Sequence, residues 1–497
     1  MKMAISPTRR EDFPEWYQEV IKAADLAEHA PVRGCMIIKP NGYAIWENIQ
    51  STLDKKFKEI GVQNAYFPLF IPLSYIEKEA SHIEGFAKEC AIVTHTRLEK
   101  GVDGKLTPTN QLEEPLIVRP TSEMIIGDSF AKWIKSYRDL PMKVNQWCNV
   151  VRWEMRPRLF LRTSEFLWQE GHTAHATSDD GEMQARGMLD LYANFARDIL
   201  AIPVITGDKS EGERFPGAVN TLTFEGMMQD GKALQMGTSH FMGTNFAKAS
   251  GIQFLNESGN LEYVNTTSWG VTTRMIGAII MVHSDDNGFV MPPRVASKHV
   301  AIVPFLVKEE HNSEVLSYCH KLAEELNKII YYNKSVVAFV DTTNRRGGEK
   351  KWDAIKKGYP LRLEIGKRDI EQNRLPLFLR TKENDSILLS KDELIKEITN
   401  YLDQIHDTLY QKAFKFQQEN IVSVNSLTEF ADLFREGDVF PNHFVSAPFI
   451  GNKIVEGQIQ KEYNVTIRCI PHDQPQLAQC IFTKNSGARH AIFAKAY

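Results

Sequence analysis

The sequence predicts an α+β protein in which helices flank an antiparallel sheet, followed by two smaller α/β units. Three patterns carry this prediction. Strand-like alternation in residues 149–154 and 166–172 flanks a loop, which is typical of a β-hairpin. Several segments place apolar residues three or four positions apart, as amphipathic helices do. After Pro292-Pro293, apolar runs alternate with helical segments, which favours a compact α/β domain with a mixed sheet.

Length and charge limit the class of protein. The chain has 497 residues, enough for two or three domains with cores of their own. We expect units at 1–296, 297–403 and 404–497. The net charge of −4 argues against a protein that coats nucleic acid indiscriminately. This net charge is still compatible with an RNA partner, because basic residues can gather on one face of the protein.

Composition favours a cytoplasmic protein with no membrane partner. No apolar run approaches the roughly 18 to 20 residues that a membrane helix needs. The start, MKMAISPTRREDF, lacks the apolar core of a secretion signal. The six cysteines, at positions 35, 90, 148, 319, 469 and 480, show no close pairing, so we expect reduced and mostly buried thiols.

Apolar spacing predicts the elements of the first unit. Helices are expected at 13–27, 43–60 and 182–199, the last behind the capping candidates Ser178, Asp179 and Asp180. Strands are expected at 64–71, 220–225 and 233–240. Pro68 removes a ladder donor, which places its strand at an edge or an interface. A helix packed on an edge strand and an interface between chains remain equal alternatives here.

The hairpin gathers charged and aromatic side chains. Alternation gives one face to Arg152 and Glu154, and one face of the returning strand to Phe166, Trp168, Glu170 and His172. A solvated hairpin with one wet face is the simple interpretation. Trp168 between two charged neighbours instead favours a small pocket with an apolar wall. The loop arginines could grip phosphate oxygens through paired donors: Arg156, Arg158 and Arg162.

Two helix entrances carry further candidates. Residues 116–122 predict a strand that enters a helix reaching Trp133, and Thr121 and Glu123 could cap that helix and face its dipole. A second helix, apolar almost all round from Met275 to Val282, should be buried. Its entrance would present N–H groups and a guanidinium to a phosphate, or else a surface ion pair, through Thr272 and Arg274.

The amino-acid sequence of these segments resembles that of one enzyme family. RWE followed by RPRLFLRTSEFLWQEGHTAH resembles the second signature motif of class II aminoacyl-tRNA synthetases, in the version carried by the prolyl-tRNA synthetase family. The helix and strand at 43–71 resemble the first motif and residues 268–296 the third. The likeness covers nearly the whole chain. The spacing of the motifs leaves no room for a large editing insertion, as in the archaeal and eukaryotic type.

Other nucleotide-binding signatures are missing from the sequence. It contains no G-x-x-x-x-G-K-[ST] phosphate loop and no G-x-G-x-x-G fingerprint after a strand. The class I synthetase signatures are absent as well. Any ATP would therefore be held by arginines and strands, as in class II enzymes.

The resemblance implies a reaction and its partners. It implies ATP-dependent attachment of L-proline to tRNA(Pro) through a prolyl-adenylate, with release of AMP and pyrophosphate. It implies Mg²⁺ and a homodimer formed through the first motif. A paralogue that binds RNA without charging it, and a class II relative for threonine, are the alternatives, and the intact motif residues argue against both.

The resemblance also implies residue roles. Arg152 would be catalytic and contact both substrates. Proline would further meet Thr121, Glu123, Trp168, Glu170, His172 and His240, although a lone histidine such as His240 is more often structural. ATP would further meet Glu154, Arg162, Thr163, Gln235, Thr238, Thr272 and Arg274.

The second unit carries a basic and aromatic cluster in glycine-rich loops: Arg345, Arg346, Lys350, Lys351, Lys356, Lys357, Lys367, Arg368, Trp352 and Tyr359. Such runs are usually solvated loops, but single-stranded RNA also needs phosphate contacts and stacking. The resemblance implies an anticodon-binding domain here. Glu364 and Arg368 are then candidate base readers.

The third unit departs from the family pattern. Related enzymes often hold structural zinc there through four cysteines, and the matching positions are Ile450, Val455, Cys480 and Phe482. One thiolate cannot form a tetrahedral zinc site. We therefore expect no metal, with apolar packing in its place.

Overall fold

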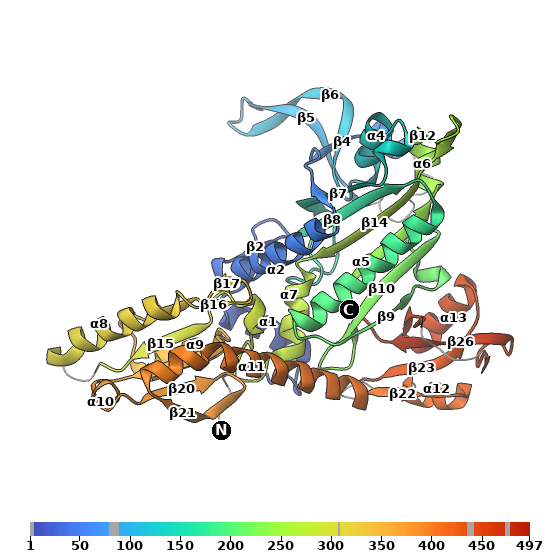
Figure 1. Cartoon of the computed structure of the whole chain (residues 1–497). Helices are drawn as coiled ribbons and strands as arrows, with labels where there is room; N and C mark the ends of the chain where they lie inside the picture. The colour runs from blue at the N-terminus through green and yellow to red at the C-terminus, as the bar shows by residue number, and fades with distance from the viewer. Residues whose placement is uncertain (1–3, 79–88, 307–308, 435–441, 473–477) are drawn as a thin grey trace.

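The computed structural model describes residues 4–78, 89–306, 309–434, 442–472 and 478–497. Its first unit is built on a seven-stranded sheet (Figure 1). The strands follow the order β3-β7-β8-β14-β11-β10-β9, and every neighbouring pair is antiparallel except β3 with β7. Their bounds are Gln63–Asn64, Met142–Val151, Glu165–His175, Asn265–Thr272, Ala233–Gly243, Asn220–Met227 and Val204–Asp208. The predicted antiparallel core is confirmed.

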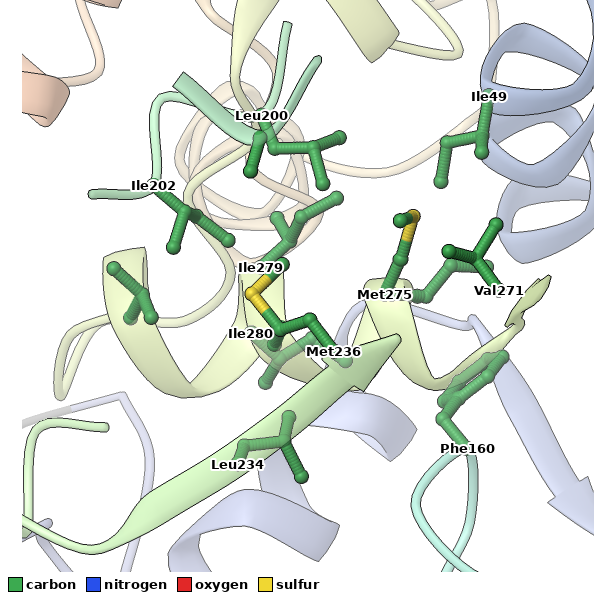
Figure 2. Packing of buried hydrophobic residues seen from close by; sticks show 14 of the residues in the cluster. Ile49, Phe160, Leu200, Ile202, Leu234, Met236, Val271, Met275, Ile279 and Ile280 are labelled. Carbon is green, nitrogen blue, oxygen red and sulfur yellow. The ribbon is translucent and has the colours of Figure 1, made fainter. Parts of the chain in front are cut away.

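Helices cover this sheet and fill its core. Helix α5 (Ser178–Asp198) lies along β10, β11 and β14, and α7 (Arg274–His283) is buried at Met275–His283, as its apolar sequence predicts. Figure 2 shows Met275, Ile279 and Ile280 of α7 among the side chains of Ile49, Leu234, Met236 and Leu200. Ile49 comes from α2 (Pro40–Glu59), which continues the core from α1 (Phe13–Ala23).

Two expected elements differ in the structure. The strand predicted at 64–71 is wrong as a single strand. Strand β3 ends at Asn64, and β4 (Phe70–Pro72) joins a separate three-stranded sheet, with Pro68 between them, where it donates no ladder hydrogen bond. The first helix ends at Ala23 instead of Ala27, because Asp25 has a positive φ of 56° and β1 (Ala27–His29) follows.

The three-stranded sheet carries a projecting hairpin. Strands β5 (Ala91–Lys100) and β6 (Leu106–Val118) extend beyond the rest of the unit (Figure 1). Strand β6 then leads into α4 (Glu123–Trp133). The smaller elements of this unit are β2 (Met36–Ile38), α3 (Leu73–Lys78), α6 (Asn245–Ser250), β12 (Gln253–Leu255) and β13 (Leu261–Tyr263).

The second unit is an α/β domain with a mixed sheet, as predicted. Strand β15 (Val300–Pro304) pairs in parallel with β18 (Ala338–Val340) and β19 (Leu361–Ile365), and antiparallel strands continue the sheet. The remaining elements are α8 (Glu309–Leu326), β16 (Ile330–Tyr331), β17 (Lys334–Ser335), α9 (Gly347–Lys356), α10 (Lys367–Glu371), β20 (Leu375–Leu379) and β21 (Lys382–Leu389). Helix α11 (Lys391–Glu419) runs across residue 403 into the third unit.

The third unit adds to the sheet of the first. Its elements are β22 (Ile421–Ser423), α12 (Leu427–Phe434), β23 (Phe444–Phe449), α13 (Lys453–Tyr463), β24 (Thr466–Cys469), β25 (Ala478–Gln479) and β26 (Ser486–Ala494). Asp208 at the end of β9 bridges to Ile470, and Ala233 at the start of β11 bridges to Ala496. Residues near the end of the chain therefore contact the central sheet at these two points.

A buried ion cluster joins these two units. Glu225 of β10 is fully buried and accepts from Lys209 at 2.9 Å and from Arg468 of β24 at 2.9 Å. Burial alone would raise the pKa of Glu225, but the two cations hold it below its usual range. The cluster ties the third unit to the strand beside β11.

None of the helices in the described ranges combines the length and apolar character that crossing a bilayer requires.

We expect Glu225→Gln to lower the free energy of unfolding by about 3–5 kcal/mol, because two buried cations lose their counter-charge. The folded pKa of Glu225 lies below its unfolded value, so its contribution is present above the unfolded pKa and is lost as the pH falls through the folded pKa. Urea unfolding at pH 7 and at decreasing pH measures both effects. Glu257→Gln, at an exposed position, is the control. Equal stability of the two variants at pH 7 would contradict this account.

The four positions expected to replace zinc ligands lie in or beside an apolar core. Cys480 is buried, Val455 and Phe482 pack against the same cluster, and Ile450 is 39% exposed. The Phe482 ring meets Phe430 with centroids 5.0 Å apart. Within the described ranges no group of three or more His, Cys, Asp or Glu side chains could hold a metal ion.

We predict that the purified chain holds no structural zinc, because one thiolate among apolar side chains cannot complete a tetrahedral site. Elemental analysis of protein purified without chelator should return far less than one zinc per chain, and Cys480→Ser should leave that value unchanged. One tightly held zinc per chain would overturn the prediction.

Candidate active site

One cavity unites the candidate residues. It has a volume of about 560 Å³ and lies over the face of the central sheet that β8, β11 and β14 share. Its wall includes every residue expected to bind proline or ATP: Thr121, Glu123, Arg152, Glu154, Arg162, Thr163, Trp168, Glu170, His172, Gln235, Thr238, His240, Thr272 and Arg274. The structure therefore brings together side chains that lie up to about 150 positions apart.

The start of α4 forms one end of the cavity. Ser122, not Thr121, occupies the position before the helix, and its side chain makes no capping bond, so the expected cap at Thr121 is wrong. The Thr121 hydroxyl donates instead to the carboxylate of Glu123, which lies in the first turn as expected. Both oxygen-bearing side chains are therefore free of a capping role.

A buried carboxylate holds α4 against the sheet. Glu170 of β8 accepts from the Ser122 hydroxyl, from the Ser122 N–H at 3.2 Å and from Gln146 Nε2 at 2.7 Å. On its own strand, the His172 Nε2 lies 3.1 Å from the Glu170 carboxylate. Glu170 is 3% exposed, so protein groups surround it almost completely. Glu170 therefore acts mainly by holding the residues around it in position.

Opposite charges stabilise each other within this pair. Burial alone would raise the pKa of Glu170, but the hydrogen bond and charge of His172 hold it below its usual range. Burial alone would lower the pKa of His172, but Glu170 raises it. Both shifts favour the ion pair, a carboxylate beside an imidazolium.

Arg152 follows the end of β7 and points into the cavity. Strand β7 ends at Val151, so Arg152 and Glu154 lie in the loop, and the expected strand alternation there is wrong. The Arg152 Nε donates to the Pro120 carbonyl at 2.8 Å, and its guanidinium lies 5.4 Å from the Trp168 ring centre. Burial lowers the pKa of Arg152, although Glu123 and Glu170 act in the opposite direction.

His240 is a neutral part of the wall. Thr221 and Thr238 hydroxyls lie 3.0 Å from its two ring nitrogens, and the Phe215 ring centre lies 4.6 Å from that of His240. Burial, followed by the charge of His172, lowers the pKa of His240 to about 3. The imidazole therefore offers a flat, uncharged surface at neutral pH.

The entrance of α7 forms another part of the cavity. Arg274 begins the helix and donates through Nε to the Leu161 carbonyl and through Nη1 to the Gln235 carbonyl, both at 3.2 Å. Its N–H donates to the Thr272 hydroxyl at 3.0 Å. Burial, followed by the charge of Arg162, lowers the pKa of Arg274 to about 10. It stays charged at neutral pH and suits an anion.

The loop arginines separate into two groups. Arg162 lines the cavity beside Thr163, whereas Arg156 and Arg158 are absent from its wall. The Arg158 guanidinium lies 5.8 Å from the ring centre of Tyr497, the last residue of the chain. Of the three candidates for phosphate binding in this loop, the structure places only Arg162 in the cavity.

Several wall residues were not predicted. Glu213, Arg214 and Phe215 come from a turn with no periodic pattern, so the sequence carried no signal for them. Gly270 had a usable signal, because a glycine inside a strand often marks close approach. A Cβ at Gly270 would lie 2.9 Å from the Gln169 carbonyl, so this position needs glycine.

The second unit places its candidates far from the cavity wall. Glu364 accepts from Arg362 at 2.8 Å, and Arg368 lies exposed on α10. Part of the basic cluster is not available to RNA. Lys350 and Tyr359 are buried, which corrects their assignment to a surface cluster. The Asp353 carboxylate pairs with two further members, Arg345 and Lys357.

Family models match the three units in order. The tRNA synthetase class II core domain (G, H, P, S and T) matches residues 105–283, the anticodon binding domain 299–401, and the prolyl-tRNA synthetase C-terminal domain 439–497. A Proline--tRNA ligase of Protochlamydia amoebophila is 53% identical and aligns over 100% of this chain and 99% of its own length. One of Rhodopirellula baltica is also 53% identical, over 100% and 98%.

A solved structure agrees with these relatives. A prolyl-tRNA synthetase from Cryptosporidium parvum, complexed with halofuginone and AMPPNP, superposes with a TM-score of 0.89 at 36% identity, over 99% of this chain and 97% of that one. Similarity of this extent covers the catalytic core, the second unit and the third. The chain belongs to the prolyl-tRNA synthetase family of class II aminoacyl-tRNA synthetases, the ligases that use ATP and Mg²⁺ to join proline to tRNA.

Proposed function

We propose that this chain attaches L-proline to tRNA(Pro) through a prolyl-adenylate and that both steps take place in the cavity over β8, β11 and β14. The convergence of all expected proline and ATP residues on that cavity carries the proposal. A catalytically silent paralogue would not need carboxylate, hydroxyl and guanidinium groups arranged together around an enclosed space.

The amino-acid end suits a secondary ammonium. The ring nitrogen of proline has two N–H donors, and Thr121 with Glu123 offers a hydroxyl and a carboxylate as acceptors. Trp168 and neutral His240 provide flat walls for the ring. In this proposal Glu170 and His172 face the substrate and also fix α4 from behind.

The nucleotide end suits the phosphates of ATP. We assign Arg152 to the α-phosphate and Arg162 with Arg274 to the outer phosphates, since guanidinium groups bind phosphate oxygens through paired donors. Glu154 would contact the adenine. The remaining proposed contacts are Thr163, Gln235, Thr238 and Thr272.

Magnesium fits as an ion held mainly by ATP. Mg²⁺ sites in such enzymes use one or two protein carboxylates together with substrate phosphates and water. Glu154 is assigned to the adenine, so phosphate oxygens and water would supply most of the ligands of this ion. Bound in this way, the ion supplies positive charge that reduces repulsion between the phosphates and the attacking carboxylate.

The reaction then needs positioning more than side-chain chemistry. In the first step an oxygen of the proline carboxylate attacks the α-phosphorus, the bond to the bridging oxygen breaks, and pyrophosphate leaves with the electron pair. In the second step a terminal ribose hydroxyl of tRNA attacks the acyl carbon, AMP leaves, and the hydroxyl proton passes to water. Arg152 holds the carboxylate and α-phosphate in line and stabilises the developing charge.

The other units would hold the tRNA. We propose 1–296 as the catalytic unit, 297–403 as the anticodon-binding unit and 404–497 as an extension that shares α11 with it. Exposed Arg368 and paired Glu364 are the proposed base readers. The six free cysteines suit the proposed cytoplasmic location, because thiols stay reduced there.

We predict that Arg152→Ala abolishes proline-dependent ATP–pyrophosphate exchange, because the α-phosphate loses its cation in the transition state. Exchange measured with each amino acid in turn tests the substrate at the same time, and proline should give the highest rate. Arg138→Ala, whose guanidinium lies over the neighbouring Tyr137 ring, is the control. Exchange by Arg152→Ala near the unmutated rate would show that the assignment is wrong.

We also predict a homodimer that buries the surface of β4 and β5. Tyr66 in the segment before β4, Phe70 in β4 and Ile92 in β5 are 75%, 45% and 59% exposed, a group of apolar side chains typical of an interface core. Sedimentation velocity should give a dimer for the native chain and a monomer for Phe70→Asp. Leu388→Asp, at an exposed apolar position of β21, should stay dimeric. A native chain that sediments as a monomer would refute the interface.

A further inference from the structure

We propose that Arg214 binds the phosphodiester that joins the last two nucleotides of the tRNA. Arg214 lies outside all three class II motifs, on the turn between η3 (Glu211–Glu213) and β10. The inference rests on the proposed function, since it concerns the acyl acceptor of that reaction. It assigns the residue to the second step and not to proline activation.

Arg214 stands at the rim of the substrate cavity. It lines that cavity, and it also lines a neighbouring cavity of about 680 Å³ between the first and third units. Among the described residues it is the one side chain that the two walls share. A group at a rim meets the end of an entering macromolecule before the floor residues do.

The guanidinium of Arg214 has uncommitted donors. Its Nε is buried without a hydrogen-bond partner, and in the part of the chain that the structure describes its side chain forms no ion pair. The floor arginines differ. Arg152 donates to the Pro120 carbonyl, and Arg274 donates to the Leu161 and Gln235 carbonyls. A buried guanidinium donor without a partner destabilises the folded chain, and a hydrogen bond to a bound anion would remove that penalty.

The turn that carries Arg214 is held from both sides. The N–H of Phe215 donates to the Thr221 hydroxyl at 3.1 Å, and the Phe215 ring packs on His240. On the other side, Glu456 of α13 accepts from the Ser210 hydroxyl at 2.7 Å and from the Gly212 N–H at 3.2 Å. The third unit thus positions a residue of the catalytic rim.

Distance along β11 argues against the outer phosphates of ATP as the anion. Arg214 lies beside Phe215, which packs on His240, whereas Arg274 is bonded to Gln235. Five positions on a strand separate His240 from Gln235, or about 17 Å at the usual rise. One guanidinium cannot serve both places. The proline carboxylate and the α-phosphate are already assigned to Arg152, so the anion left for Arg214 comes from another substrate.

The tRNA supplies such an anion. Its terminal ribose hydroxyl must reach the acyl carbon of the adenylate, and that carbon is attached to the ring that lies against His240. The phosphodiester on the 5′ side of the same ribose then enters with it. A charge-assisted bond from Arg214 to this phosphate would hold the ribose for attack without touching ATP.

The test separates the two steps on the full-length chain. We expect Arg214→Ala to change proline-dependent ATP–pyrophosphate exchange by less than about twofold and to slow single-turnover transfer from enzyme-bound prolyl-adenylate to tRNA(Pro) by about 10- to 100-fold, the range for a bond to a charged group. Arg214→Lys should recover part of the rate. Arg186→Ala, at an exposed arginine that lines only the neighbouring cavity, should leave both rates unchanged.

A modified tRNA identifies the phosphate. When the last phosphodiester is replaced by a neutral methylphosphonate, transfer by the native chain should fall to the Arg214→Ala rate, and the variant should lose nothing more. Equal loss of exchange and transfer in Arg214→Ala would assign the residue to the adenylate instead. Unchanged transfer, or an additional loss on the modified tRNA, would overturn the proposal. A native chain without proline-dependent exchange would instead refute the proposed function.

A second variant tests the positioning role of the third unit. Glu456→Gln keeps the size of the side chain but weakens its bonds to the turn, so transfer should slow less than in Arg214→Ala while exchange is unchanged. In the double variant the two effects should not multiply. Multiplicative effects would show that Glu456 acts independently of Arg214.

Discussion

The cavity depends on one buried carboxylate. Glu170 receives bonds from Ser122 at the start of α4, from Gln146 on β7 and from His172 on its own strand. Ser122 and Gln146 belong to other elements, 48 and 24 positions away in the chain, so the carboxylate joins the start of α4 to two strands of the sheet. Because it is almost completely buried, it needs these donors to stay charged. This network therefore supports the wall of the cavity where Glu170 and His172 lie.

The burial of Glu170 gives different roles to two neighbouring carboxylates, Glu170 and Glu123. Glu170 is neutralised by His172, so the pair adds little net charge to the pocket. Glu123 is left as the carboxylate that can meet a substrate ammonium, with the Thr121 hydroxyl beside it. Burial, followed by the charge of His172, lowers the pKa of His240 to about 3, so this imidazole stays neutral. Burial, and not the number of acidic residues, therefore decides which side chains at the floor of the cavity are charged.

Sequence patterns predicted the sheet face well, and the reason is burial. One side of β8 and β11 is enclosed, so a period of two residues places Trp168, Glu170 and His172 together in any register that keeps the fold. A periodic pattern does not predict a segment whose conformation depends on contacts with residues far away in the chain. The turn around Arg214 is held by Glu456, 246 positions from Ser210, and local sequence contains nothing of that contact. Alternation at Arg152 failed because its strand had already ended.

The third unit illustrates what such long-range contacts can achieve. Its core contains closely packed rings of Phe430, Phe482 and Phe493, so apolar burial can stabilise the domain. Next to that core, Arg468 of β24 pairs with Glu225 of the central sheet, and Glu456 of α13 accepts a hydrogen bond from Ser210 near the cavity. Arg468 binds Glu225, which lies opposite Gln235 on β11, and the Gln235 carbonyl receives Arg274. A continuous chain of contacts thus connects the last domain to Arg274 at the wall of the cavity.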